Sequence, residues 1–431
     1  MKRILAILLA LCIVMTAFAA CGNDIEGNIP IVPGTGDQNV PGVPGSPDDT
    51  PDDTPDDSSQ IPDTYNGIDL GFVRDNGLEY VWNQLEEPYK TAFAGVMNCI
   101  KNVEMIYTPT VDIPYESRSD FLALVYNCSM DYTYIGTSFA APDSNEDGFI
   151  DYIRIPYNFE VITMEPDAWA LTDALNARID EIVAGMPADA SEWEQIRYLH
   201  DTLIFSCDYS EDAQLPFTAY GALVERKATC QGYADAMHLL LSHAGFDTMF
   251  AIGVGESVLV THKWNYVKLS DGKWYILDPT WADPVDKDDP DYICYDYFMI
   301  SDEVILQDHK EKHESPYYTV PVATSMELSY HEVMGYYCTS YEQAYAATVK
   351  QVRECAEQGR RYIYIRTDPD SYDEINQKLF MKDYGGELGQ IIRDLNEEKD
   401  TGFTGSRWSR YSAHKDGSGP YTIIITLRDA E

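Results

Sequence analysis

The sequence predicts an α+β fold divided into several units. The chain has 431 residues, of which 45% are hydrophobic and 12% aromatic, enough for packed cores. Apolar residues at helical spacing and short strand-like runs both occur after the first 64 residues, and the length favours two or three domains. The formal net charge of −42 argues against nucleic acid as a partner, because phosphate neutralisation is the main source of that affinity.

Residues 1–21 are expected to be a lipoprotein signal peptide. Residues 1–3 are basic, and the apolar stretch 4–14 is short for a membrane span but right for a secretory leader. The stretch ends in Phe-Ala-Ala-Cys at Cys21, which resembles a bacterial lipobox. This resemblance implies export, lipid modification of Cys21 and anchoring in the cell membrane. Phe18 departs from the usual Leu, so cleavage without lipidation stays an alternative.

Residues 22–64 are expected to form a disordered acidic linker. They contain no Lys or Arg, ten acidic residues and a repeated Pro-Asp-Asp-Thr unit. Such a segment cannot bury enough apolar surface to offset its ordering entropy. We interpret it as a Pro-stiffened tether between the membrane and the folded part.

Residues 65–160 are expected to form an N-terminal α+β region. A helix over 88–101 is predicted by apolar residues on one face, and strands are predicted at 121–126 and 152–155. The face of the helix is formed by Phe93, Val96, Met97 and Ile100.

An Asp-rich loop at 143–151 resembles the calcium loops of EF-hands and dockerins. Gly148 stands at position six, whereas Arg154 stands at position twelve, where a bidentate acid is expected. The loop is therefore either a weak structural Ca²⁺ site or a polar hairpin loop, and no cofactor is expected to be required. Its candidate ligands are Asp143, Asn145, Asp147 and Asp151.

The central block, 161–316, is expected to begin with two helices. The first covers 167–184, and the second opens at a capping box formed by Ser191 and Glu194. His200 lies on the apolar side of the second helix, so we interpret it as a structural histidine. The apolar residues of the first helix are Trp169, Leu171, Leu175, Ile179 and Ile182.

Cys230 stands at the start of a third helix, which is predicted to end at Gly245. Residues at spacings of three and four along this run are apolar, so one face is buried. The free N–H groups and positive dipole end of a first helical turn favour a thiolate. Taken alone, Cys230 could equally be a small core residue.

Two strand-like segments, 262–269 and 273–281, flank a turn at 270–272. A two-residue turn would pair Asn265 with Asp278 and place His262 on the opposite face from Asp278. A three-residue loop with a left-handed Gly272 would pair Trp264 with Asp278, so that His262 and Asp278 share a face. A catalytic pair requires the second register.

The motifs Cys-Gln-Gly-Tyr-Ala, His-Lys-Trp-Asn and Leu-Asp-Pro-Thr-Trp stand in this order between about 190 and 285. Together they resemble the transglutaminase-like superfamily of papain-fold cysteine enzymes. The resemblance implies that Cys230 is the nucleophile, that His262 is the general base and acid, and that Asp278 orients His262. It also implies acyl transfer or hydrolysis on protein or peptide amides.

Several features of this block keep alternatives open. The aromatic residues Tyr233 and Trp264 are candidates for a substrate cleft, although such residues more often belong to the core or the cleft wall. The Cys230 N–H is one oxyanion donor, and the sequence names no second. An inactive transglutaminase-like surface protein, serving adhesion or assembly, is the alternative to an enzyme.

Residues 325–431 are expected to form a C-terminal α/β accessory domain. Helices are predicted at 341–358, 372–380 and 387–397, with strands at 361–366, 408–413 and 421–427. This part of the sequence does not indicate a function. Besides Cys12, Cys21 and Cys230, six cysteines suggest no disulfide framework: Cys99, Cys128, Cys207, Cys294, Cys338 and Cys355.

Overall fold

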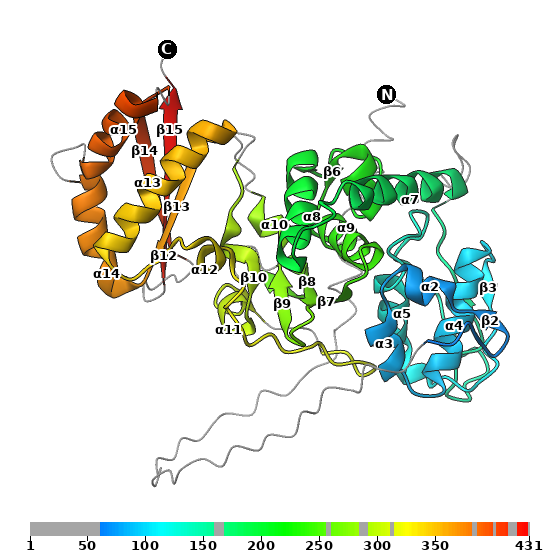
Figure 1. Ribbon diagram of the computed structural model, residues 1–431. Helices are drawn as coiled ribbons and strands as arrows, with labels where there is room; N and C mark the ends of the chain where they lie inside the picture. The colour runs from blue at the N-terminus through cyan, green and yellow to red at the C-terminus, as the bar shows by residue number, and fades with distance from the viewer. Residues whose placement is uncertain are drawn as a thin grey trace, which may run out of the picture.

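The computed structural model describes residues 61–158, 168–255, 260–283, 292–310, 314–381, 386–399, 402–412 and 420–429. The predicted signal peptide and nearly all of the predicted linker, including Cys21, lie outside these residues. Figure 1 shows a central unit with the N-terminal region on one side and the C-terminal unit on the other. In the described ranges, no helix combines the length and the hydrophobicity needed to cross a lipid bilayer.

The N-terminal region combines short helices with two short strand pairs. Short strand pairs join β1 (Thr64–Tyr65) to β2 (Ile68–Asp69) and β3 (Ile106–Tyr107) to β4 (Ile153–Arg154). The four apolar residues on which the prediction of a helix over 88–101 rests are buried in α4, so this helix is confirmed. The helices are α2 (Gly71–Asp75), α3 (Glu79–Gln84), α4 (Tyr89–Lys101), η1 (Tyr115–Ser117) and α5 (Arg118–Asn127).

The strand predicted at 121–126 is wrong, because this segment lies within the helix α5. Phe121, Leu124 and Val125 are buried at helical spacing, whereas Ala123 is exposed. A run of six mostly apolar residues is too short for its periodicity to separate a buried strand from one face of a helix. The Asn127 side chain also donates to the Ala123 carbonyl at 2.8 Å, as its position one helical turn later allows.

Three helices dominate the first half of the central unit: α7 (Ala168–Ala184), α8 (Glu192–Ser206) and α9 (Cys230–His243). The predicted capping box is present, since the Ser191 and Glu194 side chains each bond the other's backbone N–H. Trp169 was expected on the buried face of α7 but is 53% exposed, because at 3.6 residues per turn it lies on the side of the helix opposite to the buried Leu171 and Leu175. A π-helical turn, η2 (Gly221–Glu225), and the parallel pair β5 (Asp208–Tyr209) and β6 (Lys227–Ala228) precede α9.

The second half of the central unit is a five-stranded antiparallel sheet in the order β10-β9-β8-β7-β11. Helix α9 packs against β7 and β8, and Figure 1 shows these elements together in green. The strands are β7 (Asp247–Gly255), β8 (Val260–Lys268), β9 (Trp274–Leu277), β10 (Phe298–Ile300) and β11 (His309–Lys310). Short helical turns α10 (Pro279–Ala282), η3 (Tyr295–Tyr297) and α11 (Asp302–Ile305) connect them.

The register between β8 and β9 is the one that places His262 and Asp278 on one face. Asn265 pairs with Leu277 and Lys268 pairs with Trp274. Gly272 is left-handed, with φ +78°, and the Leu269 N–H donates to the Lys273 carbonyl at 3.1 Å. The prediction of a three-residue loop is therefore confirmed.

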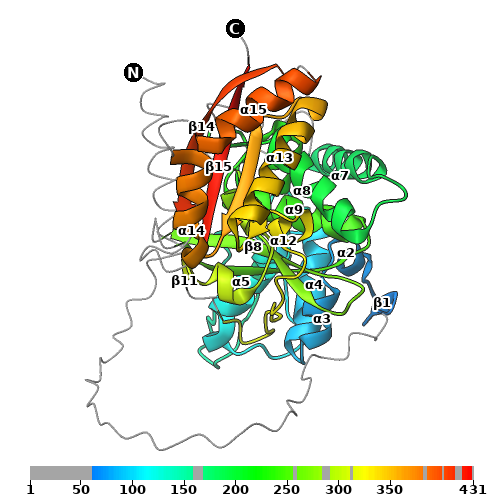
Figure 2. The same ribbon diagram turned by 60° about the vertical axis from the view of Figure 1, so that its left-hand side comes forward.

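The C-terminal unit is a mixed four-stranded sheet in the order β12-β13-β15-β14, with helices packed on it. The strands are β12 (Tyr337–Cys338), β13 (Tyr362–Thr367), β14 (Phe403–Ser412) and β15 (Tyr421–Asp429). The helices are α12 (Tyr330–Met334), α13 (Tyr341–Gln358), α14 (Pro369–Ile375), η4 (Asn376–Met381) and α15 (Gly386–Lys399). Figure 2 shows α13, α14 and α15 alongside the strands, and the predicted order of helices and strands is confirmed.

A buried polar cluster joins the C-terminal and central units. Asp296 of η3 accepts hydrogen bonds from His331 at 2.7 Å and Thr422 at 2.8 Å, and Arg366 lies 2.6 Å away. All four residues are at most 6% exposed, so the charges of Asp296 and Arg366 compensate each other inside the protein. The seven cysteines among the described residues are free thiols.

Candidate active site

Cys230 begins α9 after Thr229, whose backbone is extended. Its thiol is partly exposed and lies 3.9 Å from the carbonyl oxygen of Thr261, the residue before His262. Gly232 permits this packing, because a Cβ there would lie 2.8 Å from both the Thr218 carbonyl oxygen and the Ala228 Cβ. The start of α9 therefore lies close to the segment before it and presents the cysteine toward β8.

Asp278 is fixed between β9 and α10. It is fully buried, and its Oδ1 accepts the N–H groups of Thr280 and Trp281 at 3.0 Å each, as an N-cap residue does. Its Oδ2 lies 2.6 Å from His262 Nε2. The structure thus brings His262 and Asp278 into direct contact and leaves Nδ1 of His262 for the thiol.

The electrostatics of this pair favour a protonated, positively charged His262 beside an ionised Asp278. Burial alone would lower the pKa of His262, but the contacts with Asp278 and Cys230 outweigh it and raise the pKa from 6.5 to about 10. Burial alone would raise the pKa of Asp278, but its contacts with His262 and His309 outweigh burial and hold this pKa well below the usual value. An imidazolium beside a partly exposed cysteine is the arrangement that stabilises a thiolate.

His309 is a member of this cluster that the sequence analysis missed. From β11, its Nε2 reaches the same Asp278 oxygen at 2.8 Å, and its Nδ1 lies 2.7 Å from Asp308 Oδ1. Tyr297 donates its hydroxyl to the other oxygen of Asp308 at 2.6 Å. His309 follows the recognisable motifs by about 30 residues, and only the adjacent Asp308 hints at a buried ion pair in the sequence.

Among the described residues, one group of three side chains brings possible metal-ligand atoms within 4.8 Å of one another: His262, Asp278 and His309. Both histidines direct Nε2 at the same carboxylate oxygen at hydrogen-bond distance. Because those bonds need the protons that a metal would displace, we interpret the group as a hydrogen-bonded cluster.

The Asp-rich loop is exposed and binds its own backbone. Asp143 accepts the N–H groups of Asp147 and Gly148, and Asp151 accepts that of Ser144. The carboxylates of the loop are not among the groups that converge within 4.8 Å. The strand β4 follows the loop, as predicted, and the Ca²⁺ site at Asp143, Asn145, Asp147 and Asp151 stays a prediction.

The candidate cleft residues Tyr233 and Trp264 are both 0% exposed, so their assignment to a substrate surface is wrong. The Tyr233 hydroxyl donates inside the core, to the Cys207 carbonyl and to Asp283. In each case the aromatic ring lies on the buried side of its element, which the motif alone does not reveal. His200 is likewise fully buried and lies 3.0 Å from Asp201, in keeping with a structural role.

Partly exposed aromatic side chains do flank the site. Tyr209 is 38% exposed, and its pKa is raised by burial and by its electrostatic interaction with the neighbouring Cys230. Trp281 is half-buried, and its ring centroid lies 6.1 Å from that of His262. These two residues, unlike Tyr233 and Trp264, expose part of their surface beside the site.

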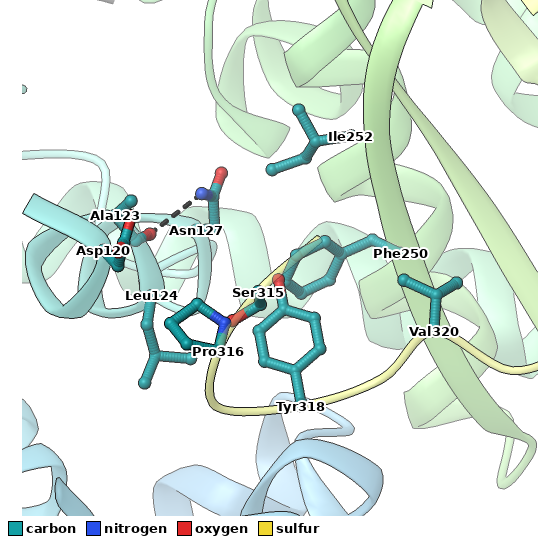
Figure 3. Close-up of a pocket in the computed structure, with 10 residues that line it drawn as sticks. All are labelled: Asp120, Ala123, Leu124, Asn127, Phe250, Ile252, Ser315, Pro316, Tyr318 and Val320. Carbon is teal, nitrogen blue, oxygen red and sulfur yellow. Dashed lines mark hydrogen bonds between the residues drawn. The ribbon is translucent and has the colours of Figure 1, made fainter. Parts of the chain in front are cut away.

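A small cavity lies between α5, β7 and residues 315–320 (Figure 3). Phe250, Ile252 and Tyr318 contribute apolar surface, and Asp120 and Asn127 line it from α5. Its volume of about 20 Å³ is enough for about one water molecule, so it is too small for a peptide side chain.

Comparison with known proteins agrees with the motifs. Residues 176–279 match the family model described as Transglutaminase-like superfamily, so the chain carries a transglutaminase-like domain in an α+β protein. A search of curated proteins finds no match.

Two solved structures illustrate the similarity. A TGase crystal structure is 14% identical, with 43% of this chain covering 52% of that one and a TM-score of 0.24. The periplasmic domain of TgpA from Pseudomonas aeruginosa, bound to ethylmercury, is 17% identical, with 33% of this chain covering 65% of that one and a TM-score of 0.22. This chain thus spans less than two thirds of either, and at these TM-scores neither supports an inference about the site.

Proposed function

We propose that this protein is an exported, membrane-tethered cysteine enzyme that transfers or hydrolyses acyl groups of protein or peptide amides. The observation that carries the proposal is the buried His262–Asp278 pair, with a contact of 2.6 Å, behind a partly exposed Cys230 at a helix N-terminus. The leader-like residues 1–21 and the acidic linker support attachment outside the cytoplasm through a lipid on Cys21.

Each residue of the triad has a distinct chemical task. The Cys230 thiolate attacks the amide carbonyl, and the N–H groups of the first turn of α9 stabilise the negative charge on the oxygen. The His262 imidazolium protonates the leaving amine, which leaves a thioester on Cys230. His262 then accepts a proton from the incoming amine or water, and the thioester is transferred or hydrolysed. Asp278 keeps the imidazole oriented and stabilises its charged form.

Alkylation by iodoacetamide at near-neutral pH, followed by peptide mass spectrometry of the full chain, tests this proposal. Cys230 is expected to react first, because burial raises the pKa of Cys99, Cys128, Cys294 and Cys338 to about 12. The His262→Ala variant should lose the rapid reaction of Cys230. His243→Ala, which alters a histidine at the far end of α9, is the matched control and should keep it.

A Cys230 that reacts only at high pH, or equally fast in His262→Ala, would favour the inactive surface protein. Within the enzyme class, incubation of a glutamine peptide with and without a primary amine separates the two outcomes. A mass increase equal to the amine minus ammonia indicates transfer, whereas conversion of glutamine to glutamate or peptide cleavage indicates hydrolysis.

A further inference from the structure

His309 lies between two carboxylates in the core beside the candidate triad. Its Nε2 is 2.8 Å from Asp278 Oδ2 and its Nδ1 is 2.7 Å from Asp308 Oδ1, and the residue is 0% exposed. Strand β11 positions it through its pairing with β7, where His309 faces Gly255. Neither ring nitrogen is available to solvent or to another partner.

The hydrogen bonds determine the protonation state of this ring. An ionised carboxylate only accepts hydrogen bonds, so each ring nitrogen must carry a proton. Burial alone would lower the pKa of His309, but the bonds to Asp278 and Asp308 raise it above the usual value. His309 is therefore a buried imidazolium whose charge is compensated on both sides.

We propose that His309 is a positioning residue of the acyl-transfer site, an imidazolium that fixes the Asp278 carboxylate and offsets part of its charge. The inference rests on the proposed function and deepens it. With His309 and His262 on Oδ2, and the N–H groups of Thr280 and Trp281 on Oδ1, both carboxylate oxygens are occupied. The carboxylate cannot rotate away from His262 without breaking several of these bonds.

The second effect is on the charge of His262. The two imidazole centroids are 5.1 Å apart, so a positive His309 makes it easier for His262 to release its proton to a leaving amine. In the described part of the chain, the titratable groups facing the two rings are Asp278, Asp308, Cys230 and Tyr297. The other nearby rings are the indoles of Trp264 and Trp281.

Two substitutions separate positioning from charge. The His309→Gln amide reaches toward the position of Nε2 and can still donate to Asp278, whereas His309→Asn reaches only toward Asp308. We expect the alkylation rate of Cys230 to stay within about twofold of wild type in His309→Gln and to fall roughly tenfold or more in His309→Asn. Both variants lose the positive charge of His309, so His262 should keep its proton to a pH about one unit higher, which its own nitrogen-15 NMR signals report.

A spectroscopic measurement on the unaltered full chain avoids any folding defect of the variants. Nitrogen-15 NMR of the imidazole rings, with His309 assigned by its disappearance in His309→Gln, should show both of its nitrogens protonated from mildly acidic to mildly alkaline pH. One unprotonated nitrogen on His309, or a His309→Asn variant with the alkylation rate and the His262 titration of wild type, would overturn the inference. A wild-type Cys230 without rapid alkylation would instead overturn the proposed function, whatever the state of His309.

Discussion

Replacing Asp278 by Asn removes one charge from the site and preserves the size of the side chain. The Asn Oδ1 can still cap α10 by accepting the Thr280 and Trp281 N–H groups, which Asp278 binds at 3.0 Å. The amide NH₂ then replaces the oxygen that contacts His262 at 2.6 Å. Because the amide donates a hydrogen bond, it favours a neutral His262 with its proton on Nδ1, the nitrogen that must take the thiol proton.

The structure indicates how large this effect is. The pKa of His262 rises from 6.5 to about 10, so at about 1.4 kcal/mol per unit Asp278 and Cys230 together stabilise the imidazolium, net of its burial, by on the order of 5 kcal/mol, and Asp278 is the larger contributor. Without that stabilisation Cys230 loses the imidazolium that favours a thiolate, and an ordinary cysteine is only about 3% thiolate at about pH 7. We therefore expect a fall of roughly 30-fold in the thiolate fraction near neutral pH.

The assay is the pH profile of Cys230 alkylation, read from the peptide that contains Cys230. In Asp278→Asn the midpoint of the rise in rate should move to about pH 8.5. Asp201→Asn alters another Asp–His pair, in which Asp201 lies 3.0 Å from His200 outside the site, and should keep the wild-type profile. A wild-type profile in Asp278→Asn would refute the assigned role of Asp278.

Three further predictions concern the framework of the site. Lys263 and Asp235 form a buried ion pair at 2.5 Å. In urea denaturation, Lys263→Met alone should lower the free energy of unfolding by about 3–5 kcal/mol, because it leaves Asp235 buried without its partner. The double variant Lys263→Met with Asp235→Leu should regain most of that free energy. Gly232→Ala should cost about 1–3 kcal/mol and slow Cys230 alkylation because its Cβ would lie 2.8 Å from a carbonyl oxygen, whereas Gly405→Ala, in open space, should change neither. Because the pKa of His262 is raised, its protonation stabilises the fold fully below pH 6.5, and this stabilisation is lost as pH rises through about 10. The difference in stability between wild type and His262→Ala, measured by thermal unfolding, should therefore shrink across that interval.

The sequence predicts the contact between His262 and Asp278 because local geometry determines it. A left-handed Gly272 and a three-residue loop are enough to choose between two registers, and that choice places His262 beside Asp278. The helix start at Cys230 follows from the periodicity of the residues after it. Most elements of the C-terminal unit are predicted for the same reason, since helix-ending glycines such as Gly359 mark their limits.

The errors arise where tertiary packing decides. The short apolar run at 121–126 fits either a strand or a helix, and its packing in α5 selects the helix. Tyr233 and Trp264 belong to functional motifs, yet both turn inward, because the depth of a side chain depends on what covers it. His309 reaches Asp278 through the pairing of β11 with β7, a long-range contact that no local pattern encodes.

The central claim is that Cys230 and His262 form a thiolate–imidazolium pair, and the ultraviolet absorbance of the thiolate tests it most directly. The difference spectrum between wild type and Cys230→Ser, recorded against pH, isolates this thiolate from the tyrosines and the other cysteines. The proposed ion pair predicts a thiolate signal already present at mildly acidic pH, which His262→Ala abolishes there. A signal that appears only near the ordinary thiol pKa of about 8.5, unchanged in His262→Ala, would contradict the assignment.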